Sequence, residues 1–191
     1  MYDGEFKGDQ ITGCGKMVWP EGHVYTGLWV NGDREGLGEL KVSVGDVYCG
    51  VWSKGNRNGL GEYLWANGQV HRGKYVDGMS QGPGVHTRPS GQVYSGDYMK
   101  DKRHGFGEMR YASGNQYIGE FIEDKRHGKG RYITKSGEVR DRVWENDTET
   151  ATPCNAEDVV AKAQKGECVD IIGIDTLLTC SFSLCSSQDQ R

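Results

Sequence analysis

Two copies of the pentapeptide Asp-Lys-Arg-His-Gly, at 101–105 and 124–128, are the segments of this 191-residue chain that look most able to do chemistry. Each copy brings together a carboxylate, two cations and an imidazole, a set of groups that can hold a metal ion or an anion. The copies start 23 residues apart. On equivalent positions of neighbouring two-stranded units, His104 and His127 would lie about 10 Å apart, which is too far for one metal ion to bridge. We therefore expect no metal site.

Other reactive groups are scattered in patterns that favour a protein without enzymatic activity or cofactor. The six cysteines form no CxxC or CxxxxH spacing that would hold zinc. The glycine-rich stretch "GCGKMVW" at 13–19 lacks the Lys-Ser/Thr pair of a phosphate-binding loop. The formal net charge of −4 gives no reason to expect nucleic-acid binding. The polar start "MYDGEFKGDQ" predicts no secretory segment, and we expect a cytoplasmic protein.

The pentapeptides belong to a 23-residue period that covers residues 2–144 without insertion or deletion. Its first column contains Tyr2, Tyr25, Tyr48, His71, Tyr94, Tyr117 and Arg140. Glycine follows two residues later, and an aromatic residue four residues later, in most copies. Three further columns, eleven, thirteen and twenty residues after the first, contain only glycine in six successive copies. The repeat therefore determines where most of the glycine and aromatic residues stand.

Each repeat is predicted to form one β-hairpin. Residues at positions 0, +2 and +4 share one face of a strand, because strand side chains alternate, and the glycine leaves room for a neighbouring ring. The sequence places a short turn such as "PEG" between the two strands, and a longer connection such as "GDREG" or "DKRHG" between hairpins. Hairpins in series predict an all-β fold, a single-layer twisted antiparallel meander whose stability depends on nearest neighbours.

The segments "YTGLWVNGDREGLG" (25–38) and "YCGVWSKGNRNGLG" (48–61) resemble the MORN repeat, whose pattern is Y-x-G-x-W-x-x-G-x-x-x-G-x-G. The resemblance covers about three-quarters of the chain. The fourth copy departs from the pattern at His71, and the seventh at Arg140 and Arg142. The resemblance implies a single-layer sheet with a groove lined by tyrosine and tryptophan. It also implies binding roles: docking of partner proteins, self-association, attachment of membranes to the cytoskeleton, and ciliary or flagellar assembly.

The first hypothesis on function is a scaffold that docks a segment of a partner protein in this groove, in cytoskeletal or ciliary assemblies. Aromatic surfaces are frequent hot spots of binding, although the same rings could serve only as core. The candidate groove residues are Tyr25, Trp29, Tyr48, Trp52, Tyr75, Tyr94, Tyr98, Tyr117 and Phe121.

The alternative hypothesis is peripheral binding of acidic phospholipids such as phosphoinositides, which has been proposed for proteins that this chain resembles. Basic residues near an anionic membrane contribute about 1 kcal/mol each, but interleaved acidic residues weaken their field. The candidates, all expected in loops between repeats, are Arg34, Arg57, Lys102, Arg103, His104, Lys125, Arg126 and His127.

The two ends depart from the repeat. Residues 2–7 would be a bare sheet edge, which invites pairing with another chain and so self-association. After the repeat array of residues 1–144, we expect a polar linker at 145–154 and a short capping helix at 155–167 with Asn155 as N-cap. Residues 168–191 resemble no module and are expected to be a disordered tail.

Overall fold

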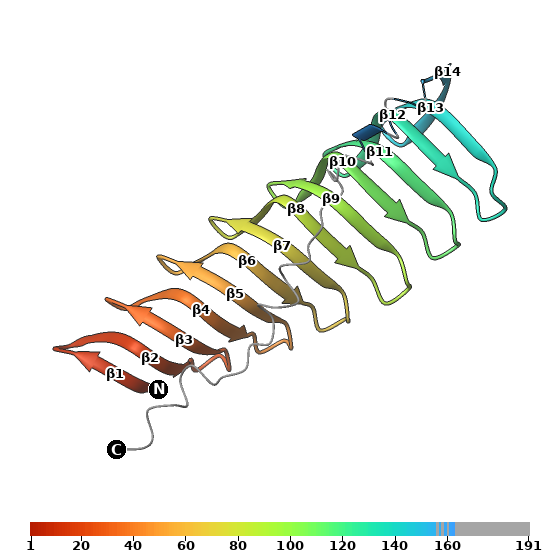
Figure 1. Cartoon of the computed structure of the whole chain (residues 1–191). Helices are drawn as coiled ribbons and strands as arrows, with labels where there is room; N and C mark the ends of the chain where they lie inside the picture. Colours follow the sequence, from red (N-terminus) through yellow and green to blue (C-terminus); the bar gives the residue numbers. More distant parts are fainter. Residues whose placement is uncertain (156, 158, 160, 163–191) are drawn as a thin grey trace. The chain divides into compact units, whose positions relative to one another are not determined.

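The computed structural model describes residues 1–155, 157, 159 and 161–162. These residues form an all-β fold of fourteen antiparallel strands in one open sheet, ordered as in the chain (Figure 1). The strands are β1 (Tyr2–Lys7), β2 (Gln10–Val18), β3 (Val24–Val30), β4 (Asp33–Lys41), β5 (Val47–Ser53), β6 (Asn56–Leu64), β7 (Val70–Val76), β8 (Met79–Thr87), β9 (Val93–Met99), β10 (Lys102–Arg110), β11 (Gln116–Ile122), β12 (Lys125–Ile133), β13 (Val139–Glu145) and β14 (Thr148–Pro153). Two compact units share them: unit 1 covers residues 1–79 and unit 2 starts at Ser80.

Every repeat supplies one hairpin, as the sequence predicts, and the hairpin closes through a two-residue turn. In the second repeat, Asn31 and Gly32 join β3 to β4 with φ angles of 51° and 89°. Lys100 and Asp101 do the same between β9 and β10, with φ angles of 52° and 66°. Two successive positive φ angles are typical of a type I′ turn, whose twist matches that of the flanking strands.

The lengths of the two connections are the reverse of those predicted from the sequence. The "DREG" segment of the second repeat lies inside β4, and the longer connection is the one that contains "PEG", between β2 and β3. The reason is a β-bulge in the long strand. Gly27 pairs with Gly38, whereas Leu28 pairs with Glu35, so β4 carries extra residues opposite β3. A bulge of this kind absorbs residues that a sequence pattern assigns to a loop.

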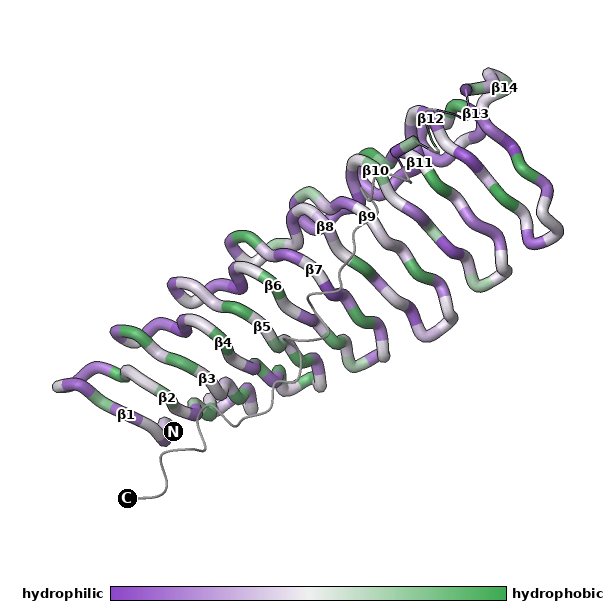
Figure 2. The backbone as a smooth tube through the Cα atoms, in the orientation of Figure 1, coloured by the Kyte–Doolittle hydropathy of each residue, from purple (hydrophilic) through white to green (hydrophobic). Residues whose placement is uncertain are grey.

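Tyrosine rings that lie over glycine build the core of the single-layer sheet. Gly27 and Gly38 face each other across β3 and β4, and a Cβ atom added to Gly38 would overlap the Tyr25 ring. Tyr25 in turn meets Trp29 and Trp52 edge to face, with ring centroids 5.0 and 5.4 Å apart. Edge-to-face pairs add about 0.5–1.5 kcal/mol beyond the apolar area that they bury. In Figure 2 no strand is hydrophobic throughout, in keeping with a sheet that has no second layer.

The sheet continues beyond the aromatic columns, into the segment predicted to be a linker. Residues 148–153 form β14, which pairs with β13 through Glu145–Thr148 and Trp144–Glu149. Asn146 and Asp147 have φ angles of 48° and 69°, so they repeat the type I′ turn of the earlier hairpins. Threonine at every second position of "TETATP" favours an extended strand, which explains the difference.

The predicted helix of residues 155–167 lies only partly in the described residues. The Asn155 side chain accepts a hydrogen bond from the backbone N–H of Glu157 at 3.1 Å, the contact expected of an N-cap. Val159 is buried, and Lys162 forms an ion pair with Glu120 at 3.3 Å. The rest of this helix and the predicted tail at 168–191 lie outside the described residues. The described part of the chain contains no helix with the length and apolarity that crossing a membrane requires.

Candidate functional site

Within each unit the predicted groove rings lie on one face of the sheet, called here the aromatic face of that unit, and all nine rings are buried. Their exposed fractions run from 0% for Tyr25 to 6% for Tyr98. Those of unit 1 form one cluster, Tyr25, Trp29, Tyr48, Trp52 and Tyr75. Tyr94, Tyr98, Tyr117 and Phe121 of unit 2 form another, with Met109 and Trp144. The rings therefore form a rigid floor, and a binding partner would touch mainly the residues that stand above it.

All four predicted lipid-binding arginines are part of this floor and lie in strands rather than in loops. The guanidinium carbon of Arg34 lies 4.2 Å from the centroid of the Trp52 ring, and Nη2 donates to the Gly55 carbonyl at 2.5 Å. Arg126 repeats the arrangement: its guanidinium carbon lies 4.1 Å from the centroid of the Trp144 ring, and its Nη2 donates to the Asp147 carbonyl at 2.8 Å. Arg57 and Arg103 stack and donate in the same way. Each arginine thus ties one repeat to the next.

A hollow of about 480 Å³ opens on the aromatic face of unit 1 and is called here the unit 1 hollow. Trp19, Leu40 and Val42 line it above Trp29, and the Trp19 and Trp29 ring centroids lie 6.5 Å apart. Its remaining lining is Glu21, His23, Gly32, Asp33, Arg34 and Gly55. Trp19 is half-buried, so part of its ring is available to a partner. Large apolar side chains ringed by polar ones are typical of a binding hot spot.

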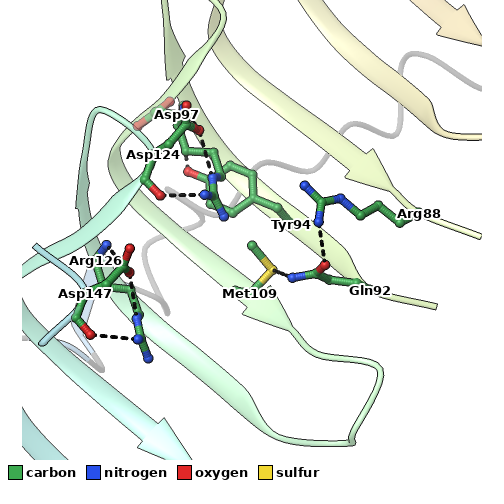
Figure 3. A network of polar contacts seen from close by, with 9 residues as sticks. Arg88, Gln92, Tyr94, Asp97, Met109, Asp124, Arg126 and Asp147 are labelled. Carbon is green, nitrogen blue, oxygen red and sulfur yellow. Dashed lines mark hydrogen bonds and ion pairs between the residues drawn. The ribbon is translucent and has the colours of Figure 1, made fainter. Parts of the chain in front are cut away.

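A smaller hollow of about 240 Å³ lies on the aromatic face of unit 2 and is called here the unit 2 hollow. Its lining is mostly polar: His86, Arg88, Gln92, Tyr94, Tyr98, Asp101, Arg103, Met109 and Asp124. Figure 3 shows Arg88 pointing to Gln92, whose Nε2 donates to the Met109 sulfur at 3.2 Å. The Arg88 Nη1 donates to Gln92 Oε1 at 3.0 Å. Sequence reasoning missed His86, Arg88 and Met109 as candidate residues, although the columns fifteen and seventeen positions after the first column contain them.

A comparison with protein families matches the MORN repeat to residues 2–24, 25–47, 48–70, 71–93, 94–116 and 117–139. The six matched segments follow one another without a gap and take in most of the chain. The chain belongs to the MORN-repeat family. Within this MORN array, the matched period coincides with the strand pairs β1–β2 to β11–β12, so that one repeat corresponds to one hairpin.

Solved structures similar to the MORN array include a TCP domain and a TCP10 domain. One is the TCP domain of SAS-4 (dCPAP) of Drosophila melanogaster, in complex with a proline-rich motif of Ana2: 16% identity, TM-score 0.45, covering 70% of this chain and 77% of that chain. Another is the TCP10 domain of Danio rerio CPAP with a STIL peptide: 14% identity, TM-score 0.32, covering 69% and 68%. A comparison with curated proteins gives no match. At these TM-scores, the likeness carries no inference about what the MORN array binds.

The Lys-Arg-His triplets of the MORN array are divided between the two faces of the sheet. Arg103 pairs with Tyr98 on the aromatic face, whereas Lys102 pairs with Met99, and strand side chains alternate. Lys102 also forms an ion pair with Glu123 at 3.4 Å. The predicted basic rim of inter-repeat loops is therefore wrong as a structural description, because the bulged strands take up these residues. Among the described residues, no group of three or more His, Cys, Asp and Glu side chains could hold a metal ion.

Burial sets the charge state of the groups on the aromatic face. Burial raises the pKa of Tyr98 well above its usual range, so its hydroxyl stays protonated. Burial, together with the nearby charges of Arg88 and Arg103, lowers the pKa of His86 below 6.5. His86 is thus neutral at pH 7, and the cations of the unit 2 hollow at that pH are the two arginines.

Proposed function

We propose that this MORN array is a non-enzymatic scaffold module that binds an extended segment of a partner protein across its aromatic face. The observation that supports it most directly is the unit 1 hollow, where Trp19, Leu40 and Val42 stand above a floor of locked rings. A large apolar side chain of the partner would enter this hollow and bury its surface there. Burial of apolar area contributes about 25 cal/mol per Å².

The rigidity of the floor favours a binding role. Edge-to-face contacts and the arginine ties hold the rings in place, so little side-chain entropy is lost when a partner lands on them. Trp19 lies above this floor and is only half-buried. An aromatic anchor on a preorganised surface is typical of residues that dominate binding energy.

Selection of displayed random linear peptides on the folded chain tests the proposal. Peptides enriched on the wild type should lose affinity by at least about tenfold on Trp19→Ala, because that ring lines the hollow. The matched control is Leu37→Ala, since Leu37 is 42% exposed and pairs with Val51 on the opposite face of the sheet. An equal loss of affinity with both variants would contradict the proposal. So would a wild-type chain that enriches no peptide.

Acidic-phospholipid binding, self-association and a ciliary or cytoskeletal location stay predictions. For lipid binding, the side chains outside the arginine ties are Lys102, His104, Lys125 and His127. Flotation with liposomes that contain or lack phosphoinositide is the direct check, and a Lys102→Gln/Lys125→Gln double variant should remove any binding that depends on these cations.

For self-association, the strand that would pair with a second chain is β1, the first strand in the order of the sheet, and sedimentation at increasing protein concentration is the measurement.

A further inference from the structure

The unit 2 hollow lies where three columns of the MORN repeat change chemistry. Ser80 stands in the column of Arg34, Arg57, Arg103 and Arg126. His86 stands in the column of Met17, Leu40, Tyr63, Met109 and Tyr132, and Arg88 in that of Trp19, Val42, Trp65, Tyr111 and Thr134. Ser80 thus stands where the other copies have arginine, and the polar His86 and Arg88 stand at the column positions that Leu40, Val42 and Trp19 occupy in the unit 1 hollow.

Arg88 is held in place by neutral partners. Its Nη1 donates to Gln92 Oε1 at 3.0 Å, and Gln92 is fixed in turn by the Met109 sulfur at 3.2 Å (Figure 3). The backbone N–H of Arg88 donates to the Gln92 carbonyl at 2.8 Å, which closes the loop between β8 and β9. Arg88 forms no ion pair within the described residues. Its side chain is exposed, with N–H donors beyond the one that Gln92 occupies.

The other charged groups of the hollow are already matched. Arg103 donates from Nε to Asp124 Oδ1 at 3.0 Å. Asp101 Oδ1 accepts from both the N–H and the hydroxyl of Ser80, at 2.7 and 3.0 Å. His86 is neutral at pH 7 because burial and the two arginines lower its pKa. Arg88 is therefore the cation of the hollow whose hydrogen-bonding capacity faces solvent.

We infer that Arg88 forms a subsite on the aromatic face of unit 2, which binds an acidic side chain, Asp or Glu, of the partner protein. This inference rests on the proposed function. A guanidinium presents a planar fork of N–H donors that matches the two oxygens of a carboxylate. Gln92 holds that fork above the floor formed by Tyr94 and Tyr98, so the arginine loses little freedom when the acid arrives.

The test is peptide selection on the wild-type chain, on Arg88→Gln and on Arg110→Gln. Arg110 is a matched control: it lies in unit 2 and forms an ion pair with Glu108, and its strand neighbour Met109 places it on the opposite face. The wild type and Arg110→Gln should enrich peptides that combine a large apolar residue with Asp or Glu. Arg88→Gln should keep the apolar preference and lose the acidic one. Replacing the acid by its amide in a selected peptide should weaken wild-type binding about tenfold and leave Arg88→Gln binding unchanged.

The outcomes separate the two proposals. Peptides with an apolar anchor but no acidic preference on any variant overturn the Arg88 subsite and leave the docking surface standing. A wild type that enriches no peptide contradicts docking and the subsite together. Preference for phosphorylated peptides over acidic ones, or binding of phosphoinositide vesicles that depends on Arg88 in the absence of acidic-peptide binding, also overturns the assignment to a carboxylate.

Discussion

The unit 1 hollow and the unit 2 hollow are built on the same repeat pattern, yet one is lined by Trp19, Leu40 and Val42 and the other by His86 and Arg88. In both units the floor is a tyrosine ring laid over a glycine pair, Tyr25 over Gly38 and Tyr94 over Gly107. The contrast shows that different columns of the MORN repeat have different roles. The glycine and tyrosine columns determine the frame, and the wall columns determine which chemistry that frame presents.

The largest expected effect concerns the shared frame. Gly38→Ala and Gly107→Ala each place a methyl group where the ring of Tyr25 or Tyr94 lies, so we expect losses of about 3 kcal/mol or more in the free energy of unfolding. Urea denaturation followed by circular dichroism measures this. Gly78→Asn is the control: its φ of 85° suits Asn, and an added side chain meets open space. A large loss of stability in only one of the two alanine variants would show that the tyrosine-over-glycine packing does not contribute equally to the two units.

The next effect separates the arginine ties from ordinary surface arginines. Arg34→Gln removes the stacking on Trp52 and the bond to the Gly55 carbonyl, and should destabilise the chain by about 1–2 kcal/mol. Arg72→Gln removes only an ion pair with Glu62 at a partly exposed site, and should cost less than about 1 kcal/mol. Thermal unfolding of the two variants side by side gives the difference. Equal losses of stability would mean that the contacts of Arg34 with Trp52 and Gly55 stabilise the fold no more than an exposed ion pair does.

Ser80→Arg should convert the unit 2 hollow towards the unit 1 arrangement. An arginine at this column position would stack on Tyr98 and donate to the Asp101 carbonyl, as Arg103 does with Phe121 and Asp124. We expect a gain of about 0.5–1 kcal/mol in the free energy of unfolding, because the new guanidinium gains a stacking contact. Ser80→Ala, which loses the hydroxyl bond to Asp101, is the comparison. If Ser80→Arg is less stable than Ser80→Ala, position 80 is not equivalent to the positions of Arg34, Arg57, Arg103 and Arg126 in the other repeats.

The smallest effect is a dependence of stability on pH that arises from His86 in unit 2. The pKa of His86 is lowered in the folded state by burial, Arg88 and Arg103, so the unfolded chain binds its proton first as the pH falls. The stabilising contribution of neutral His86 is complete above about pH 6.5 and declines as the pH falls below it. His86→Leu, which copies Leu40 of unit 1, should flatten the stability curve between about pH 6.5 and pH 5. An unchanged slope in denaturation midpoints would contradict this assignment.

The period and its glycine columns were sufficient to predict hairpins in a single layer, because only glycine fits beneath a tyrosine ring. The order of short and long connections was not predictable in the same way. The residues of the tight turn vary: its first residue is Asn31, Lys54 or Glu123 in different repeats, and its second is glycine after Asn31 and Lys54 but Asp124 after Glu123. Lysine and glutamate seldom adopt positive φ, so their local preference conceals a turn that the strand pairing imposes.

The candidate site was predictable as a face but not in its accessible residues. Tyr25 belongs to the correct column, yet its burial results from Trp52 of the following repeat, a contact that depends on the register of the strands. Arg34 and Arg103 looked like loop charges because the bulge that places them in strands leaves no simple alternation in the sequence. Trp19 and Arg88 come directly after β2 and β8, in the connections to the next strand, where the sequence pattern does not show which way a side chain points. Only the hollows show that these two side chains stand above the buried rings.

Photo-crosslinking of a selected peptide to the wild-type chain, with the sites mapped by mass spectrometry, tests the central claim most directly. The account predicts cross-links to Trp19, Leu40 or Val42 on the aromatic face, and their loss when unlabelled peptide competes. Cross-links that concentrate on Leu28, Leu37 or Leu60, the exposed apolar side chains of the opposite face, would contradict it.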